Sequence, residues 1–223
     1  MSPAPDFNRL AGPYHWLEYA TFGPWLSLAR SVFLPQVTTC RRGLVFGDGD
    51  GRFAARLLRA NPHIHIHAVD ASPAMLGALV RRAGLDVARV RTELADARAW
   101  QPDLPNGSDQ AYDAIFTHFF LDCLTTEEIQ SLAATVRSAA SPSAVWIVSD
   151  FAIPPGWYGS LVARPLIWIL YRAFGWLTGL AVRTLPDHHS ALRAASFILR
   201  DRRTWLGGLL ISELWSALQT NQP

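Results

Sequence analysis

The sequence LVFGDGDGRF at residues 44–53 decides the fold: a short apolar run leads into glycines that alternate with aspartates, and an amphipathic helix follows. About 20 residues later, IHIHAV at residues 64–69 is a second apolar segment, and Asp70 comes directly after it. A strand, a glycine-rich turn, a helix and a second strand that ends in a carboxylate are typical of the nucleoside-binding half of an open α/β sheet. The pattern therefore predicts a nucleoside site at residues 47–51 and Asp70.

The alternation of strands and helices continues to residue 151. Residues 90–95, 112–118 and 144–148 are predicted strands. Between them, Ser72-Pro73 is a helix start with a serine N-cap and a proline in the first turn, and residues 125–128 are a capping box. Repeated strand–helix units predict an α/β fold with a doubly wound, mostly parallel sheet.

The chain divides into four segments around this core. We expect an N-terminal helical cap at residues 1–40, a binding core at 41–151, an apolar helical insertion or lid at 152–190, and closing strands of the core at 191–223. With 223 residues, of which 50% are hydrophobic and 17% charged, these segments are expected to form a single domain.

The composition excludes several classes of function. Every basic residue is an arginine, so the lysine that a P-loop or a pyridoxal Schiff base needs is missing. The net charge is +2 and no basic block occurs, which argues against a nucleic-acid partner. Cys40 and Cys123 are too few for a disulfide framework, and the N-terminus lacks a signal-peptide pattern. Both features predict a cytoplasmic protein.

The two aspartates of the glycine loop discriminate between nucleoside ligands. A dinucleotide fingerprint has a third glycine or alanine where this chain has Arg52. Asp48 and Asp50 would repel a pyrophosphate, at a cost of about 1 kcal/mol or more for each close pair of charges. A cationic ligand without phosphate, such as S-adenosylmethionine, is favoured instead. A NAD-dependent oxidoreductase is the alternative.

Three motifs in order carry a resemblance to a known family. The loop, Asp70-Ala71-Ser72 after the second predicted strand and Asp96-Ala97 after the third resemble the class I S-adenosylmethionine-dependent methyltransferases over about residues 42–151. The resemblance implies a Rossmann-like methyltransferase fold and transfer of a methyl group from S-adenosylmethionine. The chain has Val45 where the family usually has an acidic residue, and Asp48 is the candidate to compensate.

The resemblance also implies which residues bind the cofactor. The loop glycines let the backbone approach the methionine and ribose, Asp70 accepts hydrogen bonds from both ribose hydroxyls, and Asp96 takes the adenine amino group. The implied set is Gly47, Asp48, Gly49 and Gly51 in the loop, Asp70, Ala71, Ser72 and Met75 after the second strand, Asp96 and Ala97 after the third, and Thr117 and His118 at the end of the fourth.

The residues that act on the methyl acceptor are less well defined. Methyl transfer needs alignment with the sulfonium, and a base only where the acceptor loses a proton. His118 and Asp122, near the end of the fourth predicted strand, are candidates for this work. His188, with His189 beside it, is a further candidate. No single base can be selected from the sequence.

A metal site is not predicted. His63, His65 and His67 alternate, so a strand places them on one face. Successive residues on one face of a strand lie roughly 7 Å apart, which is too far for them to converge on one ion.

Residues 160–182 are the second unusual feature. About 18 residues after Arg164 contain one charge, Arg172, and two glycines, which argues against a membrane-spanning helix. A core-packed helix is one interpretation. The other is an apolar lid, which suits a small hydrophobic or aromatic acceptor and shallow contact with a membrane surface. A non-catalytic S-adenosylmethionine-binding or membrane-associated protein on the same scaffold is the further alternative.

Overall fold

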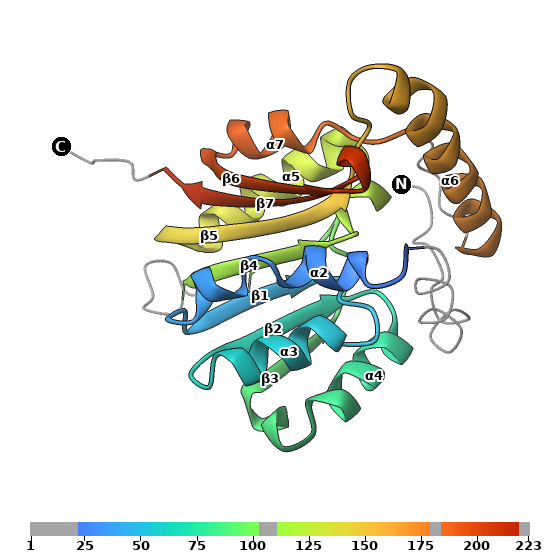
Figure 1. Cartoon of the computed structure of the whole chain (residues 1–223). Helices are drawn as coiled ribbons and strands as arrows, with labels where there is room; N and C mark the ends of the chain where they lie inside the picture. The colour runs from blue at the N-terminus through green and yellow to red at the C-terminus, as the bar shows by residue number, and fades with distance from the viewer. Residues whose placement is uncertain (1–21, 103–110, 179–183, 219–223) are drawn as a thin grey trace.

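One sheet organises the molecule. The computed structural model describes residues 22–102, 111–178 and 184–218, with the backbone alone at 173–178. Seven strands lie in the order β3-β2-β1-β4-β5-β7-β6, with β1 to β5 parallel and β7 antiparallel to both of its neighbours (Figure 1). This arrangement confirms the predicted doubly wound, mostly parallel sheet. The strands are β1 Arg42–Phe46, β2 His65–Asp70, β3 Val90–Leu94, β4 Tyr112–His118, β5 Ala140–Phe151, β6 Phe197–Trp205 and β7 Leu210–Ala217.

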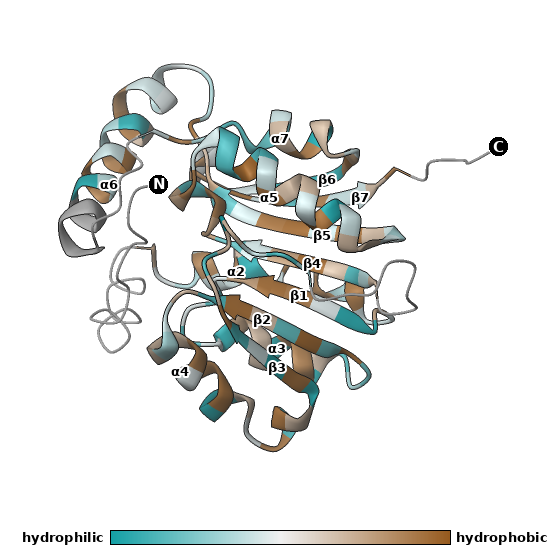
Figure 2. Cartoon of the chain, turned by 180° about the vertical axis from the view of Figure 1, so that it is seen from behind, coloured by the Kyte–Doolittle hydropathy of each residue, from teal (hydrophilic) through white to brown (hydrophobic). Residues whose placement is uncertain are grey.

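Helices cover both faces of this sheet (Figure 1). Side chains of β1 alternate between the two layers: Val45 packs on the α3 side, and Leu44 and Phe46 pack on the α5 side. The central strands are largely hydrophobic (Figure 2), as burial on both faces requires. The helices on one face are α2 Trp25–Ser31, α3 Arg52–Ala60 and α4 Pro73–Ala83, and those on the other are α5 Thr126–Ala139 and α7 His188–Ala194.

Cap chemistry sets where two of these helices begin. Ser72 Oγ accepts the N–H of Met75 at 3.3 Å, which caps α4 as predicted. At α5, Thr125 Oγ1 accepts the Glu128 N–H at 3.2 Å, and the Glu128 carboxylate accepts the Thr125 N–H at 2.9 Å. The predicted capping box is therefore confirmed.

A third apolar cluster lies beyond the carboxyl ends of the strands. The π-helical turn Gly159–Ala163 leads into α6 Arg164–Thr178. Ile167 and Tyr171 of α6 pack with Leu26 of α2. Figure 1 shows α6 at the carboxyl edge of the sheet, apart from the helices that cover its faces. In the described part of the chain, no helix is both long enough and apolar enough to cross a membrane.

The predicted segments are only partly described. Of the cap expected at residues 1–40, the structure has α2 and the short 3-10 turn η2 Leu34–Val37, while residues 1–21 lie outside the described part. Within residues 152–190 it has α6 and the first residues of α7. β6 and β7 lie within the segment expected to close the core.

Candidate functional site

Four strand ends bring the predicted site residues to one edge of the sheet. β1 leads into the glycine loop, β2 ends at Asp70, β4 ends at His118, and β5 ends one residue after Asp150. These strands are neighbours in the order β2-β1-β4-β5, so their carboxyl ends lie side by side. Open α/β sheets bind their ligands at this edge.

The loop between β1 and α3 needs glycine for two reasons. Gly47 and Gly51 have φ angles of +61° and +80°, in the left-handed region that glycine adopts without strain. Neighbouring atoms also leave no room for a side chain: a Cβ on Gly51 would lie 2.5 Å from Leu79 Cα, and one on Gly47 would overlap the ring of Phe120. The backbone itself therefore forms the surface of the loop.

The two loop aspartates have different roles. Asp50 pairs with Arg52 Nε at 2.8 Å and with Arg82 Nη2 at 2.9 Å, so guanidinium groups compensate its charge. Asp48 accepts the Ala54 N–H in the first turn of α3 at 2.8 Å, and burial raises its pKa to about 7. The loop is thus less negative than its sequence suggests. The stronger argument against a pyrophosphate is that Asp48 already occupies a helix N–H that a phosphate would use.

Asp70 is held at the end of β2 by the start of α4. Its Oδ1 accepts the Ser72 N–H at 2.8 Å, and burial raises its pKa to about 6. The Gly47 N–H donates to the Val69 carbonyl at 3.1 Å, so the loop lies against the end of β2, and the charge of Asp70 contributes to the raised pKa of Asp48. Asp70 therefore lies beside the glycine loop, as predicted, with a carboxylate that the backbone holds in place.

Asp96 follows β3 but is already engaged by an arginine. Arg98 Nε lies 3.0 Å from both carboxylate oxygens, and Arg98 Nη2 lies 2.6 Å from Oδ2. These hydrogen bonds lower the pKa of Asp96. An adenine amino group would have to share the carboxylate with Arg98, so the role implied for Asp96 requires some rearrangement.

The remaining residues of the implied set differ in exposure. Ala71 is exposed, Ala97 is partly buried, and Met75 is buried on α4. Thr117 is fully buried, and its Oγ1 accepts the Trp146 Nε1–H at 2.9 Å. The Thr117 hydroxyl is thus used inside the core on the α5 side, which argues against the predicted position beneath a methionine.

His118 is a buried, neutral histidine. Its Nδ1 lies 2.9 Å from Ser149 Oγ, and Ser149 donates to the Ala29 carbonyl at 3.1 Å, which places a proton on Nδ1 of His118. Nε2 of His118 has no hydrogen-bond partner among the described residues. The ring packs edge-on against Phe53 with centroids 4.2 Å apart. Burial, with a smaller effect from the charge of Arg30, holds the pKa of His118 well below its usual range.

Arg30 of α2 is a site residue that the sequence reasoning missed. Its guanidinium carbon lies 5.1 Å from the centre of the Phe119 ring. Its charge also lowers the pKa of both Asp48 and His118, so it acts on the loop and on the end of β4 together. The available signal was that Arg30 is the one charged residue in the apolar stretch from residue 19 to residue 40.

Asp122 and Asp150 form a buried pair after β4 and at the end of β5. The Asp122 N–H donates to Asp150 Oδ2 at 3.1 Å, and the Phe151 N–H donates to Asp150 Oδ1 at 2.9 Å. Burial raises the pKa of Asp122 to about 6 and that of Asp150 well above its usual range. Tyr171 of α6 donates to the Asp122 carbonyl at 3.2 Å, which brings the predicted lid to this pair. Asp150 was not among the predicted catalytic residues.

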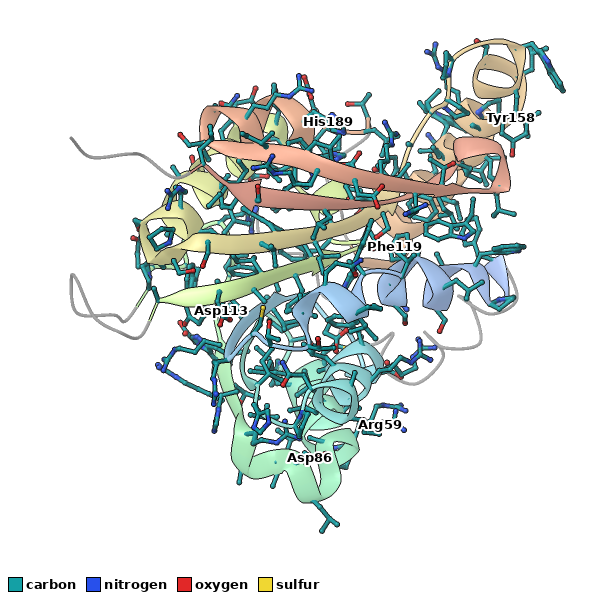
Figure 3. All side chains as sticks on the ribbon, turned by 60° about the vertical axis from the view of Figure 1, so that its left-hand side comes forward. Arg59, Asp86, Asp113, Phe119, Tyr158 and His189 are labelled. Carbon is teal, nitrogen blue, oxygen red and sulfur yellow. The ribbon has the colours of Figure 1, made fainter. Side chains whose placement is uncertain are left out.

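His188 is not brought to this site. It lies on the α5 side of the sheet, with Nε2 3.1 Å from Glu213 Oε2, whereas His118 packs on the α3 side. Figure 3 shows the same separation: His189 lies near α7, and Phe119 lies between α2 and β5. A role for His188 as a base near His118 and Asp122 therefore has no geometric support.

The alternating histidines do not converge. His67 is buried, with Nδ1 2.6 Å from the Tyr112 hydroxyl and Nε2 2.9 Å from Glu93 Oε2. His63 and His65 are exposed. These contacts explain His67 as a core residue of β2.

Comparison with protein families identifies the central part of the chain. Residues 44–146 match a family whose description is "Methyltransferase domain". The match begins in β1 and ends within β5, so it includes the glycine loop, Asp70 and Asp96. It confirms the resemblance inferred from the three motifs. Among curated proteins, no sequence matches this chain.

Solved methyltransferases share the fold. An O-methyltransferase family protein from Burkholderia thailandensis is 14% identical with a TM-score of 0.69, over 96% of this chain and 61% of that one. The S-adenosylmethionine-dependent methyltransferase SibL in its apo form is 24% identical with a TM-score of 0.61, over 98% and 63%. The 1,6-didemethyltoxoflavin-N1-methyltransferase of B. thailandensis is 16% identical with a TM-score of 0.63, over 95% and 86%. This chain thus spans about three fifths of the length of the first two.

The close contact at Gly51 leads to a prediction about stability. Gly51→Ala is expected to reduce the free energy of unfolding by about 2–5 kcal/mol, because left-handed strain adds to a clash with Leu79. Gly156→Ala is the matched control: φ is +88°, but the added Cβ would meet no atom of the described residues within 4 Å. It should cost only the strain, about 1–2 kcal/mol. Urea unfolding measures both, and equal losses would contradict the proposed clash.

Proposed function

We propose that this chain, whose residues 44–146 match the methyltransferase domain family, transfers a methyl group from S-adenosylmethionine to a small apolar or aromatic acceptor. One observation carries the proposal: the glycine loop, with its left-handed residues, and Asp70 are neighbours at the carboxyl edge of the sheet. The positive charge of Arg30 acts on Asp48 in this loop. A NAD-dependent oxidoreductase has less support, because Asp48 occupies the Ala54 N–H at the helix start where a pyrophosphate would bind.

The residues at this edge fit the chemistry of S-adenosylmethionine. The ribose has two hydroxyl donors, for which Asp70 is an anchored acceptor. The Arg30 guanidinium would compensate the carboxylate of the methionine end, and Asp48 would lie near its ammonium and sulfonium. When bound, this cofactor supplies an electrophilic methyl group on sulfur. The glycine loop contributes by letting the backbone approach the ligand closely.

An aromatic wall beside the site supports an apolar acceptor. Phe119 follows β4 with φ of +53°, a conformation that is strained for phenylalanine and recurs at functional sites. Its ring centre lies 5.3 Å from that of Phe151, which in turn lies 5.2 Å from that of Phe22. Acceptors that stack on aromatic rings would be held here by contact and by exclusion of water.

Asp122 is the residue that we assign to proton removal from the acceptor. Its backbone carbonyl accepts the Tyr171 hydroxyl of α6 and its N–H donates to Asp150, whose pKa is raised further. Two adjacent buried carboxyl groups share a proton near neutral pH, so Asp122 can be ionised while Asp150 stays protonated. His118 is assigned to positioning, because a neutral imidazole does not repel a sulfonium.

Cofactor binding tests this assignment. Calorimetry should show binding of S-adenosylhomocysteine and no binding of NAD. Asp70→Asn should weaken the affinity about tenfold or more, because it replaces charge-assisted hydrogen bonds to the ribose. Asp201→Asn, on β6 away from the site, is the control and should bind like the wild type. Binding of NAD, or equal affinities of the two variants, would contradict the proposal.

The raised pKa of Asp122 leads to a prediction about pH. Because burial raises the pKa to about 6, the folded state holds this proton more tightly than the unfolded state. The resulting stabilisation is fully present below about pH 4 and is lost as pH rises through about 6. Asp122→Asn removes this dependence. The difference in free energy of unfolding, variant minus wild type, should therefore be more favourable to the variant at about pH 8 than at about pH 4, by roughly 2 kcal/mol.

Urea unfolding at the two pH values measures this difference. Asp201→Asn again serves as the control and should follow the wild type. A constant difference between Asp122→Asn and the wild type at both pH values would show that folding does not raise the pKa of Asp122, and would contradict its assignment as the base.

Contact with a membrane surface is a further part of the proposal. Large apolar side chains are exposed on the π-helical turn and α6, including Leu161 at 72%, Trp168 at 55% and Ile169 at 56%. Arg172 lies 5.1 Å over the Trp168 ring, so cationic and aromatic groups share this face. Exposed apolar side chains with neighbouring arginines are typical of helices that lie in an anionic membrane surface. This position would deliver a lipophilic acceptor to the edge of the sheet.

Vesicle co-sedimentation tests the contact. The wild type should pellet with vesicles that contain anionic phospholipid, and Leu161→Ser with Trp168→Ser should reduce the bound fraction several-fold. Leu85→Ser removes an even more exposed apolar side chain, in the 3-10 turn η3 Gly84–Arg89 before β3, and is the control. Equal pelleting of both variants and the wild type would contradict a membrane role for α6.

A further inference from the structure

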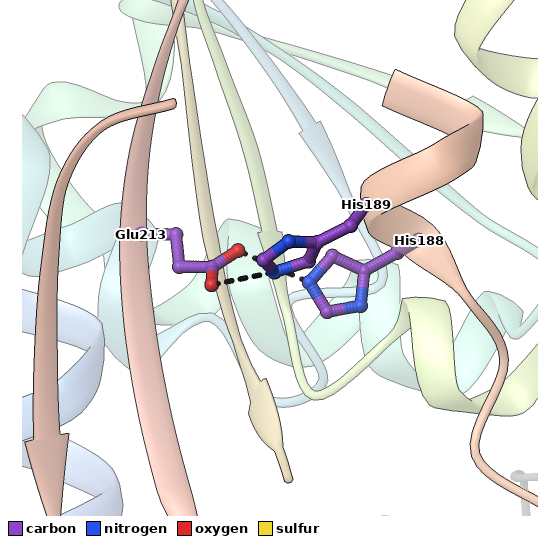
Figure 4. A group of neighbouring side chains, drawn as sticks. All are labelled: His188, His189 and Glu213. Atoms are coloured by element: carbon purple, nitrogen blue, oxygen red, sulfur yellow. Dashed lines mark hydrogen bonds and ion pairs between the residues drawn. The ribbon is translucent and has the colours of Figure 1, made fainter. Parts of the chain in front are cut away.

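Two histidines and a glutamate outside the proposed methyl-transfer site converge between α7 and β7. His188 Nε2 lies 3.1 Å from Glu213 Oε2, and His189 Nε2 lies 2.8 Å from Glu213 Oε1. The ligand-type atoms of all three residues lie within 4.8 Å of one another. Figure 4 shows both imidazoles directed from the start of α7 toward the carboxylate on β7.

We propose that His188, His189 and Glu213 bind a divalent transition-metal ion, with zinc as the best match. Two imidazoles and one carboxylate are a donor set that zinc and iron(II) sites share. For metal–ligand bonds of about 2.0–2.1 Å, ligand atoms around a tetrahedral ion lie roughly 3.3 Å apart. The two nitrogen–oxygen separations, one to each oxygen of Glu213, are within about half an ångström of that spacing. Side-chain shifts that turn both imidazoles toward one ion would complete the site.

The three ligands are held in place by groups around them. Trp215 donates its Nε1–H to Glu213 Oε2 at 3.1 Å, which orients the carboxylate. Asp187 accepts the Ser190 N–H at 3.0 Å, and its own N–H donates to Thr126 Oγ1 at 3.0 Å. These bonds fix the chain just before both histidines. Outer hydrogen bonds of this kind orient the ligands in known metal sites.

The charge at Glu213 also calls for a cation. Its side chain is fully buried. Its two carboxylate oxygens face the Nε2 atoms of His188 and His189. Arg202 Nε lies 3.3 Å from Oε1, but its side chain is 41% exposed. A divalent ion between the imidazoles would compensate the buried charge more directly, while Arg202 can turn toward solvent.

The position of the site indicates a structural role. The His189 side chain is 27% exposed, so an ion can enter from the surface and keep water as a further ligand. Glu213 pairs in register with Val148 of β5, two residues before Asp150. A bound ion would therefore fasten α7 to the part of the sheet that leads into the Asp122–Asp150 pair.

Metal titration of the full chain, after removal of any histidine tag and bound metal, tests the proposal. Zn²⁺ should bind at one ion per chain and raise the melting temperature. Co²⁺ should give a visible d–d absorption that Zn²⁺ removes. His189→Ala should weaken binding by more than about 100-fold, since loss of a ligand costs more than loss of a group that orients one. It should also abolish the thermal shift.

His65→Ala, at an exposed position of β2, is the control and should bind metal like the wild type. Glu213→Gln keeps the volume of the side chain and an acceptor for Trp215, and it should also lose binding. Absence of saturable binding at one ion per chain would overturn the proposal, as would wild-type affinity in His189→Ala or in folded Glu213→Gln. The cluster would then be a hydrogen-bonded ion pair only.

Discussion

The close approach of the turn at residues 47–51 to its neighbours is the contact on which the rest of the structure depends. Gly51 lies against Leu79 of α4, and Gly47 lies against Phe120 after β4, so this one turn sets how closely α4 and the end of β4 approach the end of β1. A packed interior has no room for even one added methyl group at such contacts. Because glycines occupy these contacts, the ends of β1, β2 and β4 meet at the backbone of the turn and not at side chains.

Charges around this turn are balanced by arginines, one at the start of the adjoining helix α3 and two from distant parts of the chain. Arg52 and Arg82 compensate Asp50, and Arg30 acts on Asp48 from α2. Several carboxyl groups at the edge nevertheless have raised pKa values because they are buried together. The edge can therefore favour a ligand that has both a cationic centre and a carboxylate, a combination that S-adenosylmethionine offers.

Much of the fold could be predicted because its determinants are local. The glycine turn and the two helix caps each depend on residues within a few positions of one another. The site is less predictable because its parts meet through tertiary contacts: Ser149, which holds His118, donates to the carbonyl of Ala29, 120 residues earlier in the chain. Likewise, nothing in the sequence near Asp122 indicates that Asp150 accepts its N–H. Charge arguments from the loop alone overlooked Arg82 and Arg30 for the same reason.

A crystal structure with S-adenosylhomocysteine tests the central claim most directly. We expect the ligand at the carboxyl edge of the sheet, with its ribose hydroxyls on Asp70, its carboxylate toward Arg30 and its sulfur facing the side of Phe119 and Asp122. A ligand bound elsewhere would contradict the assignment of the site. So would a ligand bound at this edge in the reverse orientation, with its adenine beside Arg30.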